Sequence, residues 1–142
     1  MQQSVTLLDL IPQRPPMVLV DRFLGIAPDQ SSRTTLLVTG QTPFCEGDTL
    51  TECGLIEHMA QSAAARVGWL CRRNGQPVPI GYIGSVSRFQ ADRLPLVGET
   101  VETDIRVVQE VFDISLVAAT SRIGDRPIAR CELKIFLNHA TR

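Results

Sequence analysis

Glu57 is the residue whose type and position in this chain best suit acid–base chemistry. It lies in the stretch ECGLIEHMAQSAAARVGWLCRRNG, Glu52 to Gly75, which predicts one helix of about 20 residues, roughly 30 Å long. Gly75 predicts the end of the helix, and Arg72 and Arg73 are typical of a last helical turn. The rest of the chain must therefore position this helix and the carboxylate on it.

The helix face that carries Glu57 is otherwise made of small residues. Successive helical residues are rotated by about 100°, so Glu57 and Gln61 lie side by side at positions i and i+4. The same face holds Cys53, Gly54, Ala60, Ala64, Gly68 and Cys71. Small residues allow close packing, and a carboxylate among them is costly unless it has a partner or a function. We interpret Glu57 as a functional acid; the alternative is a favourable interaction with the helix dipole.

His58 is the only histidine near Glu57, and it is a second candidate for proton transfer. Because neighbouring helical side chains diverge by about 100°, the two cannot easily share one site. The alternative for His58 is a polar residue at a helix–sheet or subunit boundary. The other histidine, His139, is expected in a solvated C-terminal tail.

Composition excludes several classes of function. With 142 residues, 44% hydrophobic and 20% charged, the chain predicts a single globular domain covering residues 1–142. A net charge of −1 does not indicate a nucleic acid or an anionic membrane as partner. Four cysteines without metal-ligand spacing, and two histidines, predict no metal site. Charged residues interrupt the helix, so no membrane span is expected, and without a signal peptide the protein is predicted to be cytoplasmic with free thiols.

The periodicity of the chain predicts an α+β domain in which a sheet wraps around the long helix. We expect a short helix from Ser4 to Ile11, with Ser4 as N-cap, and a polar loop over residues 41–51. The expected strands cover residues 17–27, 33–40, 80–91, 100–111, 112–123 and 127–138, the first two as a hairpin. In the strand over residues 100–111, alternation places one set on a common face: Val101, Thr103, Ile105 and Val107.

Three stretches of the chain resemble the hot-dog-fold (3R)-hydroxyacyl-acyl carrier protein dehydratases. IPQRPPMVLVDR, residues 11–22, is similar to the Pro-His-Arg and Leu-Val-Asp-Arg signature of that family. LIEHMAQ, residues 55–61, resembles its central-helix motif, and residues 82–101 resemble its third strand and the following turn. The GLIEHMAQ helix is most similar to a divergent branch, the predicted dehydratases of aryl polyene pigment clusters.

The resemblance implies a hot-dog fold, a curved antiparallel sheet around one long central helix. It also implies a dimer with its active sites at the subunit interface, in which one chain supplies a loop histidine and the other the helix Glu57. By register, that histidine would fall at Pro43. The chain also has Gln13 where the N-terminal signature has histidine, and Glu52 where the signature has Pro-Gly. We therefore expect that a His-bearing dehydratase homologue completes the site in a heterodimer; a homodimer is the alternative.

The implied reaction is the dehydration of 3-hydroxyacyl thioesters on acyl carrier protein, without metal or cofactor. Glu57 would act as the acid, with His58 as a second catalytic candidate. Substrate-binding candidates are Gly54, whose N–H could polarise the thioester oxygen, Gln61 beside Glu57, and Gly84, because glycine in a strand permits close approach. Arg88 and Arg93 are candidates to contact the carrier protein. A hot-dog thioesterase and a non-catalytic subunit that supports an active homologue remain alternatives.

Overall fold

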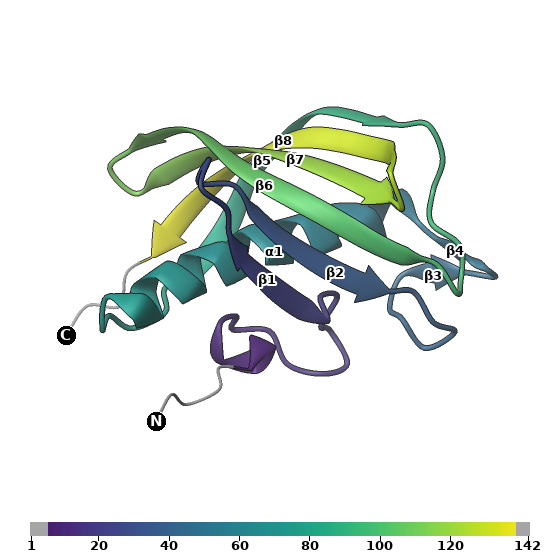
Figure 1. The fold of residues 1–142 in the computed structure, drawn as a ribbon, viewed down its shortest axis with the longest axis horizontal. Coiled ribbons are helices and arrows are strands. Elements are labelled where there is room, and N and C mark those ends of the chain that lie inside the picture. The colour runs from purple at the N-terminus through teal and green to yellow at the C-terminus, as the bar shows by residue number, and fades with distance from the viewer. Residues whose placement is uncertain (1–5, 139–142) are drawn as a thin grey trace.

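The computed structural model describes residues 6–138 and contains a six-stranded antiparallel sheet curved around one long helix (Figure 1). The sheet strands are β1 (Arg22–Ile26), β2 (Ser32–Leu37), β5 (Ile80–Ala91), β6 (Thr100–Val111), β7 (Ile114–Ile123) and β8 (Arg126–Asn138). Their order across the sheet is β1-β2-β6-β7-β8-β5, so β1 and β5 form its two edges. The helix α1 (Glu52–Arg73) lies in the concave face. This is the arrangement expected of a hot-dog fold.

The caps of α1 follow the sequence closely. The N-cap is Thr51, whose Oγ1 accepts a hydrogen bond from the N–H of Gly54 at 3.3 Å. At the other end, Gly75 has a φ of 72°, which glycine adopts at little cost, and its N–H donates to the carbonyl of Arg72 at 3.1 Å. The helix therefore begins and ends where its sequence predicts.

The main core lies between α1 and the sheet. The predicted inward face of β6 is confirmed, because Val101, Thr103 and Ile105 are fully buried and Val107 packs against the core cluster. These side chains face the apolar side of α1, where Leu55 and Met59 are also completely buried. Other members of the same core come from the remaining strands and loops: Leu19, Leu36, Val38, Leu50, Val117 and Leu133. Alternation along the strands and helical periodicity thus produce one shared core.

The N-terminal segment covers a second side of α1. A 3-10 helix, η1 (Leu7–Asp9), has Thr6 as N-cap and leads into buried Leu10 and Ile11, which pack with Ala65 and Trp69. The observed helix, Leu7–Asp9, is therefore shorter than the predicted helix over residues 4–11. The predicted N-cap, Ser4, lies outside the described residues.

Three differences from the predicted elements concern the start of β1, the start of β7 and the loop before α1. β1 begins at Arg22 rather than Met17, because the backbone of Leu19 hydrogen-bonds to side chains of α1 instead of a neighbouring strand. β7 begins at Ile114, since Phe112 adopts a φ of 55° in the turn. The loop expected over residues 41–51 contains a small ribbon of two strands, β3 (Cys45–Glu46) and β4 (Thr49–Leu50).

Candidate functional site

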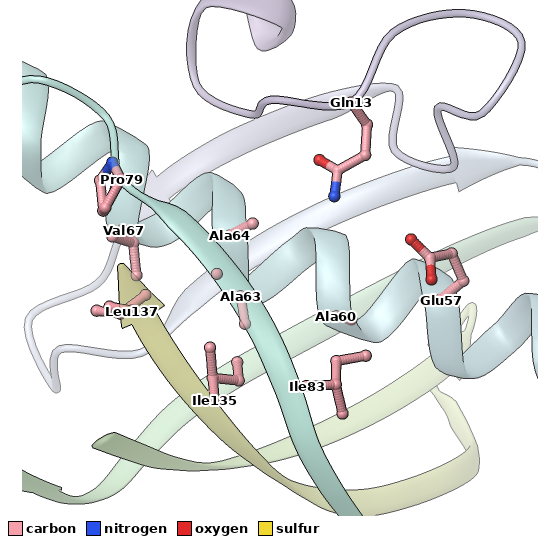
Figure 2. Close-up of a pocket in the computed structure, with 11 residues that line it drawn as sticks. Gln13, Glu57, Ala60, Ala63, Ala64, Val67, Pro79, Ile83, Ile135 and Leu137 are labelled. Carbon is pink, nitrogen blue, oxygen red and sulfur yellow. The ribbon is translucent and has the colours of Figure 1, made fainter. Parts of the chain in front are cut away.

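A cavity of about 250 Å³, here called the proximal cavity, lies between α1, β5 and β8. Two of its lining side chains are polar, Gln13 and Glu57 (Figure 2). The remainder of the lining is apolar or glycine: Ala60, Ala63, Ala64, Val67, Pro79, Gly81, Ile83, Ile135 and Leu137. An apolar cavity with a few polar groups is typical of a small-molecule site. The helix face predicted from its small residues thus forms one wall of this cavity through Ala60 and Ala64.

The carboxylate of Glu57 is held in place by Gln61, one helical turn further on. Gln61 is buried, and its Nε2 donates to Oε2 of Glu57 and to the carbonyl of Met17, both at 2.9 Å. Its Oε1 accepts from the N–H of Leu19 at 2.8 Å. Gln61 therefore ties the segment before β1 to the helix and orients Glu57. Since these bonds occupy its amide, Gln61 acts on Glu57 and does not line the cavity, so this position gives no support to a direct contact with substrate.

Gln13 is a cavity residue that the sequence prediction did not include among its site residues. It enters from the N-terminal segment, and Figure 2 shows its amide and the Glu57 carboxylate extending toward the same space. Its Oε1 is buried and has no hydrogen-bond partner among the described residues. A buried amide oxygen without a donor is unusual and costly, so this group is suited to bind a molecule in the cavity. One feature of the sequence could have identified Gln13 as a site residue: it stands where the N-terminal signature of the resembled family has histidine.

His58 does not reach the proximal cavity. Its ring is completely buried between α1 and the sheet, with Nδ1 2.6 Å from the carbonyl oxygen of Leu19 and Nε2 2.8 Å from Oγ1 of Thr103. The carbonyl can only accept, so Nδ1 carries a proton and donates it. Burial lowers the pKa of His58 from 6.5 to about 4, which keeps the ring neutral. The ring thus links the helix to the sheet, and this position gives no support to a catalytic role for His58.

The two glycines predicted to bind substrate have packing roles in this structure. A Cβ on Gly54 would lie 2.5 Å from Cδ1 of Leu50, and the Gly54 N–H is already used by Thr51. Gly84 does not line the proximal cavity; a Cβ there would lie 2.0 Å from the ring of Phe136. The glycine of β5 that lines the cavity is Gly81. Neither Gly54 nor Gly84 presents the free surface that the prediction requires.

Arg88 and Arg93, the two candidates to contact the carrier protein, differ in how far their guanidinium groups are already hydrogen-bonded within the chain. Arg93 forms two hydrogen bonds of 2.8 Å to the carboxylate of Glu99, a paired geometry that fixes the turn between β5 and β6. Arg88 lies on β5 with its side chain 82% exposed, and among residues 6–138 its one ion pair is to Glu132 at 3.9 Å. Arg88 can therefore reach an external anion, whereas the guanidinium of Arg93 is already bound.

The loop before the helix supplies no acid–base group to the cavity of its own chain. Pro43 lies in this loop and is not among the cavity residues, and the next residue, Phe44, is 42% exposed. The carbonyl of Phe44 accepts from both the N–H and the Oγ1 of Thr51, which fixes the loop to the helix N-terminus. Within residues 6–138, no cluster of His, Cys, Asp and Glu could hold a metal ion. In the same range, no helix is long and apolar enough to cross a membrane.

A curved sheet around a central helix, with a carboxylate from that helix in a cavity beside it, defines a hot-dog-fold protein with a candidate acid in its site. The family model ApeP-like (ApeP dehydratase) matches residues 5–141. The chain therefore belongs to the ApeP-like dehydratase family. A search of the curated proteins finds no match.

Solved structures share the fold at low sequence identity. The dehydratase heterocomplex ApeI:P from Xenorhabdus doucetiae has a chain 15% identical, with a TM-score of 0.87 over 96% of this chain and 93% of that chain. A hypothetical thioesterase with coenzyme A from Streptococcus pneumoniae TIGR4 is 10% identical, with a TM-score of 0.66 over 85% and 88% of the two chains. The protein smu.793 from Streptococcus mutans UA159, bound to acetyl CoA, is 10% identical, with a TM-score of 0.69 over 93% and 98%. These likenesses concern the fold alone.

Proposed function

We propose that this protein takes part in the dehydration of 3-hydroxyacyl thioesters carried on acyl carrier protein, in the cytoplasm. The observation that carries the proposal is the carboxylate of Glu57, oriented by Gln61 at the polar part of an otherwise apolar cavity. An apolar cavity suits an acyl chain, and a positioned carboxyl group suits proton transfer. Membership of the ApeP-like dehydratase family supports the reaction class.

The proposed reaction eliminates water across the C2–C3 bond of the acyl chain. A base removes a proton from C2, next to the thioester carbonyl, and the electron pair forms the double bond as the C3–O bond breaks. Glu57, in its protonated form, gives its proton to the departing hydroxyl, which leaves as water. The proton held by the base then returns to Glu57 through solvent, which restores the acid for the next turnover.

We propose that a partner chain supplies the base. In this chain, Pro43 stands where the family resemblance expects the loop histidine, and His58 is buried in the core. The second histidine, His139, lies outside the described residues. The ApeI:P structure is described as a dehydratase heterocomplex, which supports a second dehydratase chain as the partner. The proposed complete site then contains the histidine of the partner and Glu57 of this chain.

We further propose that Arg88 receives the acidic surface or the phosphopantetheine phosphate of the carrier protein, because its exposed guanidinium can form paired hydrogen bonds with such groups. Arg93 would contribute only if its pair with Glu99 opened. Arg88 lies on the edge strand β5, which we propose as the boundary with the partner chain.

The test compares three samples with a 3-hydroxyacyl carrier-protein substrate: this chain alone, a His-bearing dehydratase homologue from the same organism alone, and the mixture. Enoyl absorbance reports dehydration, and free thiol reports hydrolysis by a thioesterase. We expect little activity from this chain alone and dehydration by the mixture that exceeds the sum of the two, because loss of a general base costs a factor of roughly 10² to 10⁴. Full dehydration by this chain alone contradicts the partner proposal. Thiol release without enoyl formation contradicts the dehydratase assignment.

A further inference from the structure

Leu19, in the segment before β1, is held by two side chains of α1 at once. Its N–H donates to Oε1 of Gln61 at 2.8 Å, and its carbonyl oxygen lies 2.6 Å from Nδ1 of His58. His58 and Gln61 lie at positions i and i+3 of the helix, so one backbone segment reaches both side chains. All three residues are buried, so water does not compete for these hydrogen bonds.

The hydrogen bonds of the His58 ring have a defined direction. The Leu19 carbonyl only accepts, so Nδ1 carries the proton, and burial keeps the ring neutral by lowering its pKa from 6.5 to about 4. Nε2 is therefore the acceptor for the hydroxyl of Thr103 at 2.8 Å. Because the Thr103 proton is then in use, Ser121 donates across the 2.6 Å contact between the two hydroxyl oxygens. Buried groups of β6 and β7 thus fix the orientation of the ring.

The amide of Gln61 is oriented by the backbone that His58 holds. Its oxygen faces the N–H of Leu19 and its nitrogen faces the carbonyl of Met17, and the reverse orientation would oppose two donors and two acceptors. The other N–H of Nε2 donates to Oε2 of Glu57 at 2.9 Å. In the protonated acid Oε2 accepts this bond, so Oε1 carries the proton. A continuous chain of hydrogen bonds therefore connects His58, through Leu19 and Gln61, to the carboxyl group in the proximal cavity.

We propose that His58 is a positioning residue for the dehydration: it holds Leu19, which orients the amide of Gln61, and this amide aims the carboxyl group of Glu57. The inference rests on the proposed function, in which Glu57 is the acid. His58 does not line the proximal cavity and so does not contact the substrate there. Loss of its bond to Leu19 should lower kcat and leave KM nearly unchanged, because proton delivery depends more steeply than binding on the position of the acid.

Two neutral substitutions separate this positioning role from a role in core stability alone, because each reproduces one ring nitrogen. In His58→Asn, the amide nitrogen takes the place of Nδ1 and donates to Leu19, while the contact with Thr103 is lost. In His58→Gln, the longer side chain reaches Thr103, and the bond to Leu19 is lost. Both variants bury an amide with a partner missing, so both should lower the free energy of unfolding.

The first experiment measures kcat and KM for dehydration of a 3-hydroxyacyl carrier-protein substrate by the mixture with the partner. We expect kcat to fall about tenfold in His58→Gln and to stay within about twofold of wild type in His58→Asn, with KM within about twofold in both. The matched control is Thr34→Val, which removes a buried hydroxyl 2.6 Å from that of Ser62, outside the chain of bonds to Glu57. It should lower stability and keep kcat. Equal kcat values in the two His58 variants overturn the inference, and so does a loss in Thr34→Val as large as that in His58→Gln.

Nuclear magnetic resonance of the purified chain gives a second test, which needs neither the partner nor turnover. The nitrogen chemical shifts of the wild-type His58 ring should show a protonated Nδ1 and an unprotonated Nε2 at neutral pH. The side-chain amide of Gln61 should exchange with water about tenfold more slowly than that of exposed Gln41, and His58→Gln should abolish this difference. The reverse tautomer, or equal exchange at the two wild-type glutamines, overturns the inference whether or not the variants fold. The expected spectra together with an inactive wild-type mixture contradict the proposed function instead, because the hydrogen bonds are then present without the reaction.

Discussion

The adjacent side chains of Glu57 and His58 leave α1 in different directions and enter different environments. Glu57 lines the proximal cavity, whereas the imidazole of His58 is buried between Leu19 and Thr103. The rotation of about 100° between neighbouring helical residues is the cause. A sequence motif that places a carboxylate next to a histidine thus provides one group for the site and one for the core.

The first prediction concerns Glu57. Glu57→Gln should reduce dehydration by the mixture with the partner by roughly 10² to 10⁴, because the amide cannot deliver a proton. Gln61 can still hydrogen-bond to the amide oxygen, so the urea midpoint should change little. The matched control is Glu52→Gln, an exposed carboxylate in the first turn of the same helix, which should keep full activity. Wild-type turnover by Glu57→Gln would show that Glu57 is structural.

The second prediction concerns Gln13, whose substitution should lower activity without lowering stability. Gln13→Leu removes a buried oxygen for which the described part of the chain offers no donor, so the free energy of unfolding should stay the same or rise slightly. If the amide binds substrate, KM should rise or kcat fall by roughly five- to tenfold, the effect of one hydrogen bond. Gln41→Leu, on an exposed loop, is the control for a surface glutamine. Unchanged kinetics in Gln13→Leu would remove Gln13 from the site.

The buried imidazole of His58 makes stability depend on pH. Burial lowers its pKa from 6.5 to about 4, so between these values the unfolded chain binds a proton that the folded chain does not. The free energy of unfolding contributed by this group is therefore highest above pH 6.5 and falls as the pH falls. The loss between pH 7 and pH 5 should be roughly 2 kcal/mol. Urea unfolding at the two pH values measures it.

His58→Gln is the control for this pH dependence. It removes the titrating group and keeps a donor and an acceptor, although it should lower stability at both pH values. The difference between the wild type and His58→Gln should then shrink as the pH falls, because the wild type loses stability that the variant does not have. A constant difference between pH 7 and pH 5 would mean that His58 keeps an ordinary pKa in the folded protein.

The sequence predicted the parts of the fold that local physics determines. The end of α1 near Gly75 and the alternation of β6 needed only neighbouring residues, and β5 was predicted with its observed bounds, Ile80–Ala91. The start of β1 was predicted too early because Leu19 bonds to Gln61 and His58, which are distant in sequence. Gln13 belongs to the cavity only through the path of the N-terminal segment over α1, and a helix pattern cannot reveal that path.

Gly68 gives a prediction about this N-terminal segment. A Cβ at Gly68 would lie 1.9 Å from the carbonyl oxygen of Leu10, so α1 and the segment approach more closely than alanine permits. Gly68→Ala should lower the free energy of unfolding by roughly 1 to 3 kcal/mol despite the higher helix propensity of alanine. Gly40→Ala is the control, because no atom of the described residues lies within 4 Å of its Cβ position. Denaturant unfolding of both variants measures the effect, and equal stability would show that Leu10 moves aside freely.

The last prediction concerns the edge strand β5, which we expect to join this chain to a second copy or to its partner. β5 has a free edge and carries exposed apolar side chains, with Ile80 48%, Ile83 41% and Val86 38% exposed. A long apolar edge of this kind favours pairing with another strand. Val86 pairs with Leu133 on the neighbouring strand β8, and paired residues point to the same side of a sheet. Leu133 is completely buried, so Val86 also lies on the side of the sheet that faces the core.

Val86→Arg should weaken this association, because it places a charge where two edges would pack and, in a homodimer, sets two like charges near each other. Light scattering at micromolar concentration should show a dimer for the wild-type chain or its mixture with the partner, and a larger monomer fraction for the variant. Val108→Arg is the matched control, since Val108 lies on the interior strand β6 and is 54% exposed. It should leave the mass unchanged. Equal masses for Val86→Arg and the wild type would move the interface away from β5.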